Sequence, residues 1–267
     1  MRRFALRPRK PIDRADTGAN QTLRRGLSLL KAFRPGFSVL TNGALAELSG
    51  LAPSTVSRMT GALVEAGLLR QLPGSRGYAP TAACISLGFA AFQALASPRQ
   101  KVLARMEEAA ERHNVSVSLA APDGDDMVYV DTFRRARRET LMHIAPGVRI
   151  PMTYTALGTA ALACMPADTR AAHIAHLVAR HTGDRAVLRA QIAQGVQHHQ
   201  EQGWCQASWV ADVVGVARAV HLPAQGILSF NCAGSSAQMS ASKIERKLVP
   251  LLFELTELAT AADEATR

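Results

Sequence analysis

Apolar residues recur at helical spacing early in the chain. Leu23, Leu27 and Leu30 stand at positions i, i+4 and i+7, which predicts a helix that turns these three leucines toward a core. A second helix is expected over 41–49, with Thr41 as its N-cap residue. The region therefore starts as a pair of short amphipathic helices.

A third helix is expected over 53–66. Pro53 suits the first helical turn, where its missing N–H would have no intrahelical partner in any case. Val56, Met59 and Leu63 recur on one side of this helix and form its predicted buried stripe. The opposite side is left to face outward.

A β-hairpin is predicted directly after the third helix. The segments 68–72 and 78–79 have strand character, and residues 73–77 between them, with the sequence PGSRG, supply the turn. Helix, helix, turn, helix and a hairpin with a basic tip form a winged helix-turn-helix, a module that docks its third helix in the major groove of DNA.

Another apolar helix is expected over 81–97, ended by Pro98. Ile85, Phe89 and Phe92 lie at helical spacing along it. A helix of this kind between two domains must bury its apolar side chains, either against a partner chain or against its own chain. Because a single helix-turn-helix makes few DNA contacts, proteins that carry one usually dimerise.

Strand and helix patterns alternate over residues 98–267. Val115, Val117 and Leu119 alternate as in a strand, and Asp123-Gly124 turns the chain into a second strand. The alternation fits one α+β sensor domain of about 170 residues. Its other elements are expected as helices over 155–164, 168–180 and 184–202, strands over 213–221 and 226–232, and a final helix that opens with a capping box from Ser242 to Glu245.

Positive charge is concentrated at one end of the chain. Residues 1–80 hold 13 Lys and Arg against 4 Asp and Glu, whereas residues 81–267 hold 18 against 17. Six of the basic residues lie among the first 14, so residues 1–20 are expected to form a disordered basic arm. A basic module on an otherwise balanced chain is typical of a polyanion binder, although a solubilising tail would give the same count.

The outward side of the third helix carries the side chains expected to contact DNA. Ser54, Thr55 and Ser57 suit phosphate contacts at a helix N-terminus, and Arg58 suits a bidentate contact with guanine. Arg76, at the hairpin tip, is expected to reach a phosphate or a minor groove. The alternatives are that Arg58 is merely solvated and that the whole module binds protein instead of DNA.

Seven short motifs of the chain are shared with a known family. They are GLAPSTVSR (50–58), LVEAGLL (63–69), PGVRIP (146–151), TALGTA (155–160), QGW (202–204), GVARAV (215–220) and ILSFN (227–231). With these motifs, almost the whole chain after residue 20 resembles the IclR-type bacterial transcriptional regulators.

The resemblance implies a fold and a function. The fold is α+β: a winged helix-turn-helix DNA-binding domain over 21–80, a linker helix for dimerisation over 81–97, and a GAF-like α/β effector-binding domain over 98–267. The function is that of a homodimer or homotetramer that binds operator DNA of a metabolic, most simply catabolic, operon as a repressor or activator. The effector is a small organic or aromatic acid.

Four residues are expected at the effector site. Gly158 opens a helix where unpaired N–H groups favour an anion, and its lack of a side chain would let a carboxylate approach the backbone. Ser229 and Asn231 share one face of a strand, so both can point into the same pocket. Gly215, where the family commonly has cysteine, would enlarge the cavity for an acid of more than three carbons. The alternative is that these residues have ordinary packing roles.

Other chemistry receives little support from the sequence. The S-x-x-K motif at Ser240–Lys243 lacks its companion motifs, and the scattered histidines lack metal-binding spacing, so we expect no catalytic residue, metal or cofactor. The run Arg134–Arg138 is expected to be a solvated loop, with a DNA contact or an acidic ligand as alternatives. The competing function is a small-acid-binding protein or enzyme that uses the helix-turn-helix for assembly.

The expected location is the cytoplasm. No secretory signal or membrane-spanning stretch is evident, so no membrane partner is expected. The four cysteines lack the spacing of a zinc site and are too few for a disulfide framework.

Overall fold

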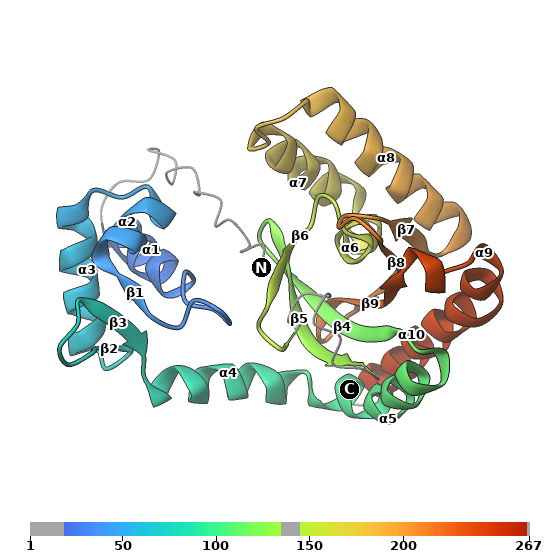
Figure 1. Cartoon of the computed structure of the whole chain (residues 1–267), viewed down its shortest axis with the longest axis horizontal. Coiled ribbons are helices and arrows are strands. Elements are labelled where there is room, and N and C mark those ends of the chain that lie inside the picture. Colours follow the sequence, from blue (N-terminus) through green and yellow to red (C-terminus); the bar gives the residue numbers. More distant parts are fainter. Residues whose placement is uncertain (1–18, 135–144, 266–267) are drawn as a thin grey trace. The chain divides into compact units, whose positions relative to one another are not determined.

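The computed structural model describes residues 19–134 and 145–265, so nearly all of the expected basic arm lies outside the described residues. The chain divides into two units, Met1–Ala91 and Phe92–Arg267 (Figure 1). Among the described residues, no helix is both long enough and apolar enough to cross a bilayer.

The first unit is a three-helix module with a small sheet. Its three strands are antiparallel in the order β1-β3-β2, and the β2–β3 hairpin is the predicted wing. Strand β1, which pairs with β3, was not expected from the sequence because it is only two residues long. The elements are α1 (Ala19–Leu30), β1 (Leu40–Thr41), α2 (Asn42–Ser49), α3 (Pro53–Glu65), β2 (Leu69–Gln71) and β3 (Gly77–Pro80).

Helix α1 turns a different face inward from the one predicted. Leu29 is fully buried, whereas Leu23 and Leu27 are 62% and 48% exposed. Gly26, one turn earlier on the same face, lies beside Met59 of α3, where a Cβ would be 3.8 Å from the Met59 sulfur. The face that carries Gly26 and Leu29 therefore enters the core, and two of the predicted core leucines face outward.

The linker helix predicted over 81–97 corresponds to α4 (Ala82–Ala94), and a second helix, α5 (Ala96–His113), follows it directly. Pro98 was expected to end the linker helix. Instead it lies in the first turn of α5, where the missing N–H of a proline costs no intrahelical hydrogen bond. In α4, Ile85 and Phe89 are largely exposed, whereas Phe92 packs against the core of the second unit.

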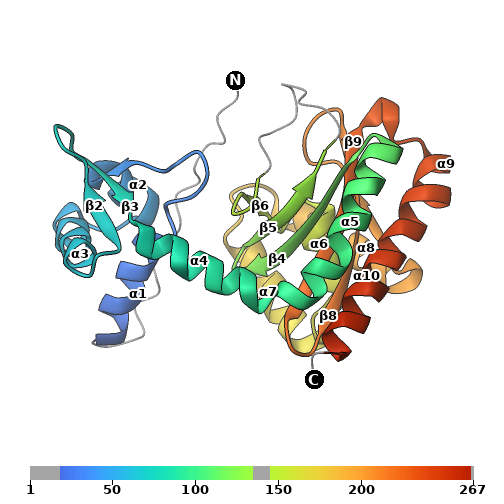
Figure 2. The ribbon, with the colours of Figure 1, turned by 90° about the horizontal axis from the view of Figure 1, so that it is seen from below.

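The second unit is built on a six-stranded antiparallel sheet in the order β6-β5-β4-β9-β8-β7. Helices cover both of its faces, as Figures 1 and 2 show. This architecture confirms the expected α+β fold of this part of the chain. After α5, its elements are β4 (Ser116–Asp123), β5 (Asp126–Phe133), β6 (Arg149–Pro151), α6 (Ala156–Cys164), α7 (Ala167–Ala179), α8 (Arg185–Gln202), β7 (Cys205–Ala207), β8 (Val213–Leu222), β9 (Gly226–Ser235), η1 (Ser236–Gln238), α9 (Ala241–Lys243), the π-helical turn η2 (Ile244–Leu248) and α10 (Val249–Glu264).

The two faces of this sheet have separate cores. On one face α5 and α10 pack on apolar side chains such as Leu119 and Phe230. On the other face α6, α7 and α8 pack on a second set that includes Tyr129 and Leu157. Because side chains alternate along a strand, neighbouring residues of β9 serve different cores. This alternation puts Ser229 and Asn231 on the opposite face from Phe230, toward α6.

The cap of the last helical segment lies two residues earlier than predicted. The Ser240 hydroxyl, not that of Ser242, accepts the Lys243 N–H at 3.3 Å. Ser242 is exposed inside the first turn. The helical segment then passes through the π-helical turn η2 into α10.

All four cysteines carry free thiols. Cys205 and Cys232 are buried in the sheet, and Cys84 and Cys164 are half-buried on helices. The Cys205 thiol donates to the Ala156 carbonyl oxygen at 3.3 Å, which ties β7 to the start of α6.

Candidate DNA-binding surface and effector pocket

The first turns of α3 present polar side chains outward. Pro53 is the first residue of the helix, as predicted. Ser54, Ser57 and Arg58 are exposed and Thr55 is half-buried. The predicted inner stripe is confirmed by three buried side chains: Val56, Met59 and Leu63. The helix can therefore place hydroxyls and one guanidinium against a partner while its other side stays in the core.

A buried threonine fixes α3 against α2. The Thr60 hydroxyl lies 3.0 Å from the Asn42 side-chain oxygen and 3.1 Å from the Val56 carbonyl oxygen. Thr60 is fully buried, so these contacts satisfy a hydroxyl that has no access to water. The sequence pattern did not single out this residue, because threonine occurs on buried and exposed helix faces alike.

The wing carries two exposed arginines. Arg76 lies at the hairpin tip, as predicted, and Arg70 lies on β2. Next to Arg76, a Cβ at Gly77 would lie 2.7 Å from the Val39 side chain, so a larger residue there would require Val39 to move. Arg70 was not among the predicted contacts, although its alternation with buried Leu69 indicates an outward position.

Small residues form a cross-strand row at one end of the large sheet. Ser116 of β4 is opposite Ala233 of β9, which is opposite Gly215 of β8, which is opposite Ala207 of β7. Because these four residues have short side chains or none, they leave space above the sheet at this point. All four line a cavity of about 100 Å³, which we call the inner pocket.

The inner pocket lies between this row and the start of α6. Most of its wall is apolar or small, and a few polar groups interrupt it, which is the usual composition of a ligand site. The other lining residues are Tyr129, Arg134, Ile150, Thr155, Ala156, Leu157, Trp209, Val210, Val213 and Asn231.

Three of the four predicted effector residues lie on the pocket's side of the sheet. Gly215 and Asn231 line the pocket, and a side chain at Gly215 would come within 3.8 Å of the Asn231 amide nitrogen. Ser229 shares the face of Asn231 but does not line the pocket. The Ser229 hydroxyl and the Asn231 side-chain oxygen are both buried without a hydrogen-bond partner. Such groups are costly unless something binds them.

Gly158 has a different role from the one predicted. It does not line the inner pocket, and its N–H already donates to the Thr155 hydroxyl at 3.1 Å. A side chain there would lie 2.1 Å from the Met152 carbonyl oxygen, so the glycine is required by backbone packing. The expectation that a carboxylate approaches this backbone is corrected: Thr155, Ala156 and Leu157 are the residues of this segment that reach the pocket.

Arg134 and Tyr129 bring ionisable groups into the inner pocket. Burial raises the pKa of Tyr129 to about 12, so its hydroxyl stays protonated at neutral pH and can donate a hydrogen bond. Burial lowers the pKa of Arg134, whose Nε atom is buried without a hydrogen-bond partner. The sequence favoured a solvated loop for this arginine; the rest of the run, 135–138, lies outside the described residues.

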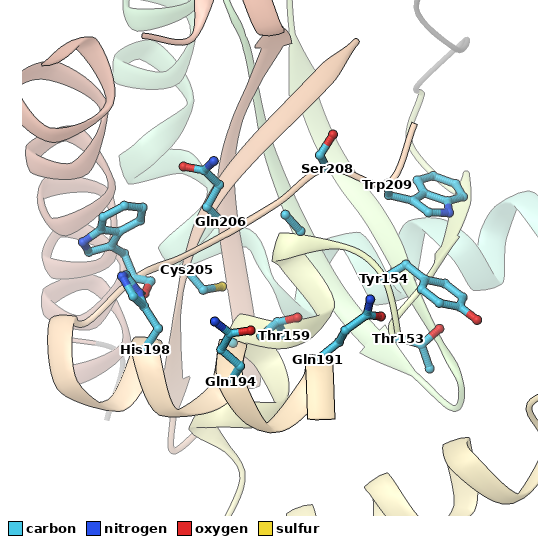
Figure 3. A pocket seen from close by; sticks show the side chains of 13 residues that line it. Thr153, Tyr154, Thr159, Gln191, Gln194, His198, Cys205, Gln206, Ser208 and Trp209 are labelled. Carbon is cyan, nitrogen blue, oxygen red and sulfur yellow. The ribbon is translucent and has the colours of Figure 1, made fainter. Parts of the chain in front are cut away.

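A larger and more open cavity of about 640 Å³ lies beside the inner pocket, and we call it the outer cleft. Figure 3 shows Gln191, Gln194 and His198 of α8 along one side of it and the residues from Cys205 to Trp209 along the other. Ala207 and Trp209 line both cavities. None of the polar side chains described in the outer cleft is buried without a partner, so its groups make a weaker case for a ligand.

The enzyme-like motif has a structural explanation. Ser240 caps a helix, and the Lys243 ammonium donates to the Gln238 carbonyl oxygen at 3.0 Å. Within residues 19–134 and 145–265, no three His, Cys, Asp or Glu side chains are grouped so as to hold a metal ion.

Comparison with known proteins matches both units. The first unit matches the family model of the IclR helix-turn-helix domain over residues 22–73. Residues 97–257 match the C-terminal domain of the bacterial transcriptional regulator IclR.

Individual relatives match over nearly the full length. The HTH-type transcriptional regulator TsaQ1/TsaQ2 of Comamonas testosteroni is 31% identical over 263 residues, which are 96% of this chain and 93% of the relative. The crystal structure of an IclR family transcriptional regulator from Brucella abortus superposes with a TM-score of 0.81 at 30% identity, covering 94% of this chain and 96% of that one. An IclR homologue from Microbacterium hydrocarbonoxydans, complexed with 4-hydroxybenzoate, has the same fold at 15% identity, with a TM-score of 0.67 over 91% of this chain and 99% of that one.

Proposed function

Because the chain belongs to the IclR family of bacterial transcriptional regulators, which join a DNA-binding domain to an effector domain, we propose that it controls a metabolic, most simply catabolic, operon in response to a small organic or aromatic acid. The proposal rests on one observation: a single chain holds both an exposed recognition-helix turn and a pocket with buried, unpartnered polar groups. The cytoplasm is the proposed location. The family is non-enzymatic, so the chain is a regulator and not an enzyme.

The DNA-binding surface is assigned to α3 and the wing. Ser54, Thr55 and Ser57 would contact phosphates, and Arg58 would contact a guanine in the major groove. Arg76 would contact the backbone or a minor groove beside it. The exposure of these side chains, combined with a buried inner stripe on the same helix, supports the assignment.

A second copy of the chain is the proposed partner. Ile85, Leu87 and Phe89 of α4 are 73%, 63% and 63% exposed, and none of the side chains of α4 is buried. Exposed apolar groups of this size are typical of a protein interface. We propose that α4 packs in a homodimer, which can pair further into a homotetramer, and that the two recognition helices read an inverted repeat.

The inner pocket is the proposed effector site. Asn231 would bind a polar group of the acid, and Gly215 would leave room for its body. The relative complexed with 4-hydroxybenzoate gives a precedent for a ring of that size in this fold. Ligand binding would shift the balance between DNA-competent and DNA-incompetent dimers by its different affinity for the two states.

The proposal is tested by footprinting purified protein on the chromosomal region beside its own gene, with and without candidate acids. A protected inverted repeat is expected, with two chains bound per site in sedimentation of the complex. At least one acid should change the affinity for that repeat. Protection without symmetry, one chain per site at saturation, or no retardation of the DNA would contradict the proposal.

A further inference from the structure

The half-buried Arg134 lines the inner pocket, and its Nε atom has no hydrogen-bond partner among the described residues. Arg134 directly follows β5, one position beyond Phe133, which is paired with Val117. This register places Arg134 beside Ser116, at the end of the row of small residues. Thr132, two residues earlier, hydrogen-bonds Ser118 on the same face of the sheet at 2.8 Å. Alternation along the strand therefore directs Arg134 toward the pocket, as the lining confirms.

The nearest carboxylate on the same strand is already engaged on the other face. Asp131 accepts two hydrogen bonds from the Arg99 guanidinium, from Nε at 2.5 Å and from a terminal nitrogen at 3.0 Å. Phe133 also packs on that face, against the core beneath α5 and α10. Arg134 thus projects away from the acid three residues before it.

A second arginine of the same sheet shows how such a charge is normally balanced. Arg149 of β6 donates to Asp123 at 2.7 Å and to Asp126 at 2.9 Å. These two carboxylates raise the pKa of Arg149 although burial alone would lower it. For Arg134 burial lowers the pKa, and the group that acts against this is the hydroxyl of Tyr129. Partial removal of this charge from water, with no carboxylate of the described residues beside it, is unfavourable in the free protein.

We propose that Arg134 binds the acidic group of the effector, which is a singly charged aromatic acid whose ring lies over the row of small residues. This inference rests on the proposed effector role of the inner pocket. A guanidinium binds a carboxylate or sulfonate through two parallel hydrogen bonds, which also fixes the plane of the ligand.

The surroundings of Arg134 set the size and polarity of this ligand. A cavity of about 100 Å³ suits one ring more than a fused ring system. Ser116, Ala233 and Gly215 form a flat floor, and the protonated Tyr129 hydroxyl can donate a further hydrogen bond. Arg134 is the one cationic side chain among the described lining residues, so they would leave a second acidic group on the ligand unbalanced.

The first experiment measures ligand binding by calorimetry on the full chain. Benzoate and benzenesulfonate are the anionic probes, and benzamide is the neutral counterpart with the same ring. We expect the anions to bind the unmodified chain at least about 10-fold more tightly than benzamide, the scale of one charge-assisted hydrogen bond. Arg134→Met should lose at least about 10-fold in anion affinity and keep its benzamide affinity. Arg189→Met, which removes an exposed charge from α8, is the matched control and should behave as the unmodified chain.

The second experiment needs no ligand. Because no carboxylate of the described residues pairs with Arg134, Arg134→Met should leave the melting temperature of the free protein unchanged or raise it by up to about 3 °C. Arg149→Met should lower it by several degrees, because it removes the guanidinium that forms ion pairs with both Asp123 and Asp126. A fall for Arg134→Met as large as that for Arg149→Met would make Arg134 a structural residue and would overturn the inference.

The remaining outcomes separate this inference from the proposed function. If neither anion binds, or if Arg134→Met binds benzoate as well as the unmodified chain does, Arg134 is not the acid-binding residue. If operator affinity still responds to some acid in Arg134→Met, the proposed function stands and this inference fails. If benzoate binds through Arg134 but never changes operator affinity, the anion site stands and the proposed coupling to DNA fails.

Discussion

At Gly158 the backbone of one segment touches the backbone of another. A Cβ at this position would lie 2.1 Å from the Met152 carbonyl oxygen and 2.4 Å from its Cα, both parts of the main chain. Unlike the end of a flexible side chain, these atoms cannot move aside without displacing β6 or α6. The requirement for glycine here therefore comes from packing.

We predict that Gly158→Ala lowers the free energy of unfolding by about 2–4 kcal/mol, because even a methyl group forces the two segments apart. Urea unfolding followed by circular dichroism measures the change. Gly61→Ala in α3 is the control, since nothing lies within 4 Å of the new methyl group and alanine favours a helix. Equal stability of the two variants would contradict the packing role.

His199 should make the protein sensitive to acid. Burial lowers the pKa of this histidine to about 4, and its Nε2 accepts the Ala219 N–H at 3.4 Å. The unfolded chain, with an ordinary pKa near 6.5, binds the proton more readily, so stability is present above about pH 6.5 and is lost as the pH falls toward 4. We predict a loss of about 1–2 kcal/mol between pH 7 and pH 5 from this group. His199→Gln keeps a hydrogen-bond acceptor but does not titrate, so its free energy of unfolding, measured by urea titration at pH 7 and pH 5, should fall less than that of the unmodified chain. An identical fall would assign the effect to other groups.

At the scale of elements, the two sides of α3 differ: one side packs in the core, and the other carries the exposed side chains proposed to contact DNA. We predict that Arg58→Ala weakens binding to the specific operator by about 1–3 kcal/mol, the scale of one base contact, and leaves non-specific binding less affected. Fluorescence anisotropy with operator and scrambled duplexes at one salt concentration measures both. Arg246→Ala, which removes an exposed charge from η2, is the control. Unchanged operator affinity would show that α3 does not read bases through Arg58.

Helix α4 should hold two copies of the chain together. We predict that the double substitution Ile85→Ser with Phe89→Ser raises the dimer dissociation constant by at least about 100-fold, because two large apolar side chains lose their partner surface. Analytical ultracentrifugation measures the constant, and Gln93→Ser, an exposed change on the same helix, is the control. A monomer–dimer equilibrium that does not change would place the interface elsewhere.

The ends of helices were predictable from the sequence where capping or breaking residues close in the chain determine them. Thr41, Pro53 and Gly50 fix the ends of α2 and α3 through contacts within a few residues, and the structure confirms them. The orientation of α1 was not predictable, because the approach of Gly26 to Met59 joins residues 33 positions apart. Pro98 was misread because a proline stops one helix and starts another with the same local geometry.

At the scale of the whole molecule, the inner pocket depends on the order in which the strands are paired in the large sheet. Ser116, Ala233 and Gly215 come from separate parts of the chain and meet only because β4, β9 and β8 are neighbours in the sheet. The sequence identified Gly215 and Asn231 through the family motif. It gave no reason to select Ser116, and it offered an acidic ligand for the run Arg134–Arg138 only as an alternative to a solvated loop, since arginines in a basic run are common on surfaces.

Three thiols of the second unit, that of Cys164 on α6 and those of Cys205 and Cys232 in the sheet, are poorly reactive toward oxidants. Burial raises the pKa of Cys164 to about 11 and of Cys205 and Cys232 to about 12, so thiolate is scarce at neutral pH, and thiolate is the form that reacts with peroxides and electrophiles. In the native protein we predict one rapidly labelled thiol with Ellman's reagent, that of half-buried Cys84, and four after denaturation. Rapid labelling of Cys205 would contradict this. The thiol that joins β7 to the start of α6 thus lies close to the inner pocket without being open to oxidation, so we expect a passing oxidative stress to leave ligand binding in that pocket intact.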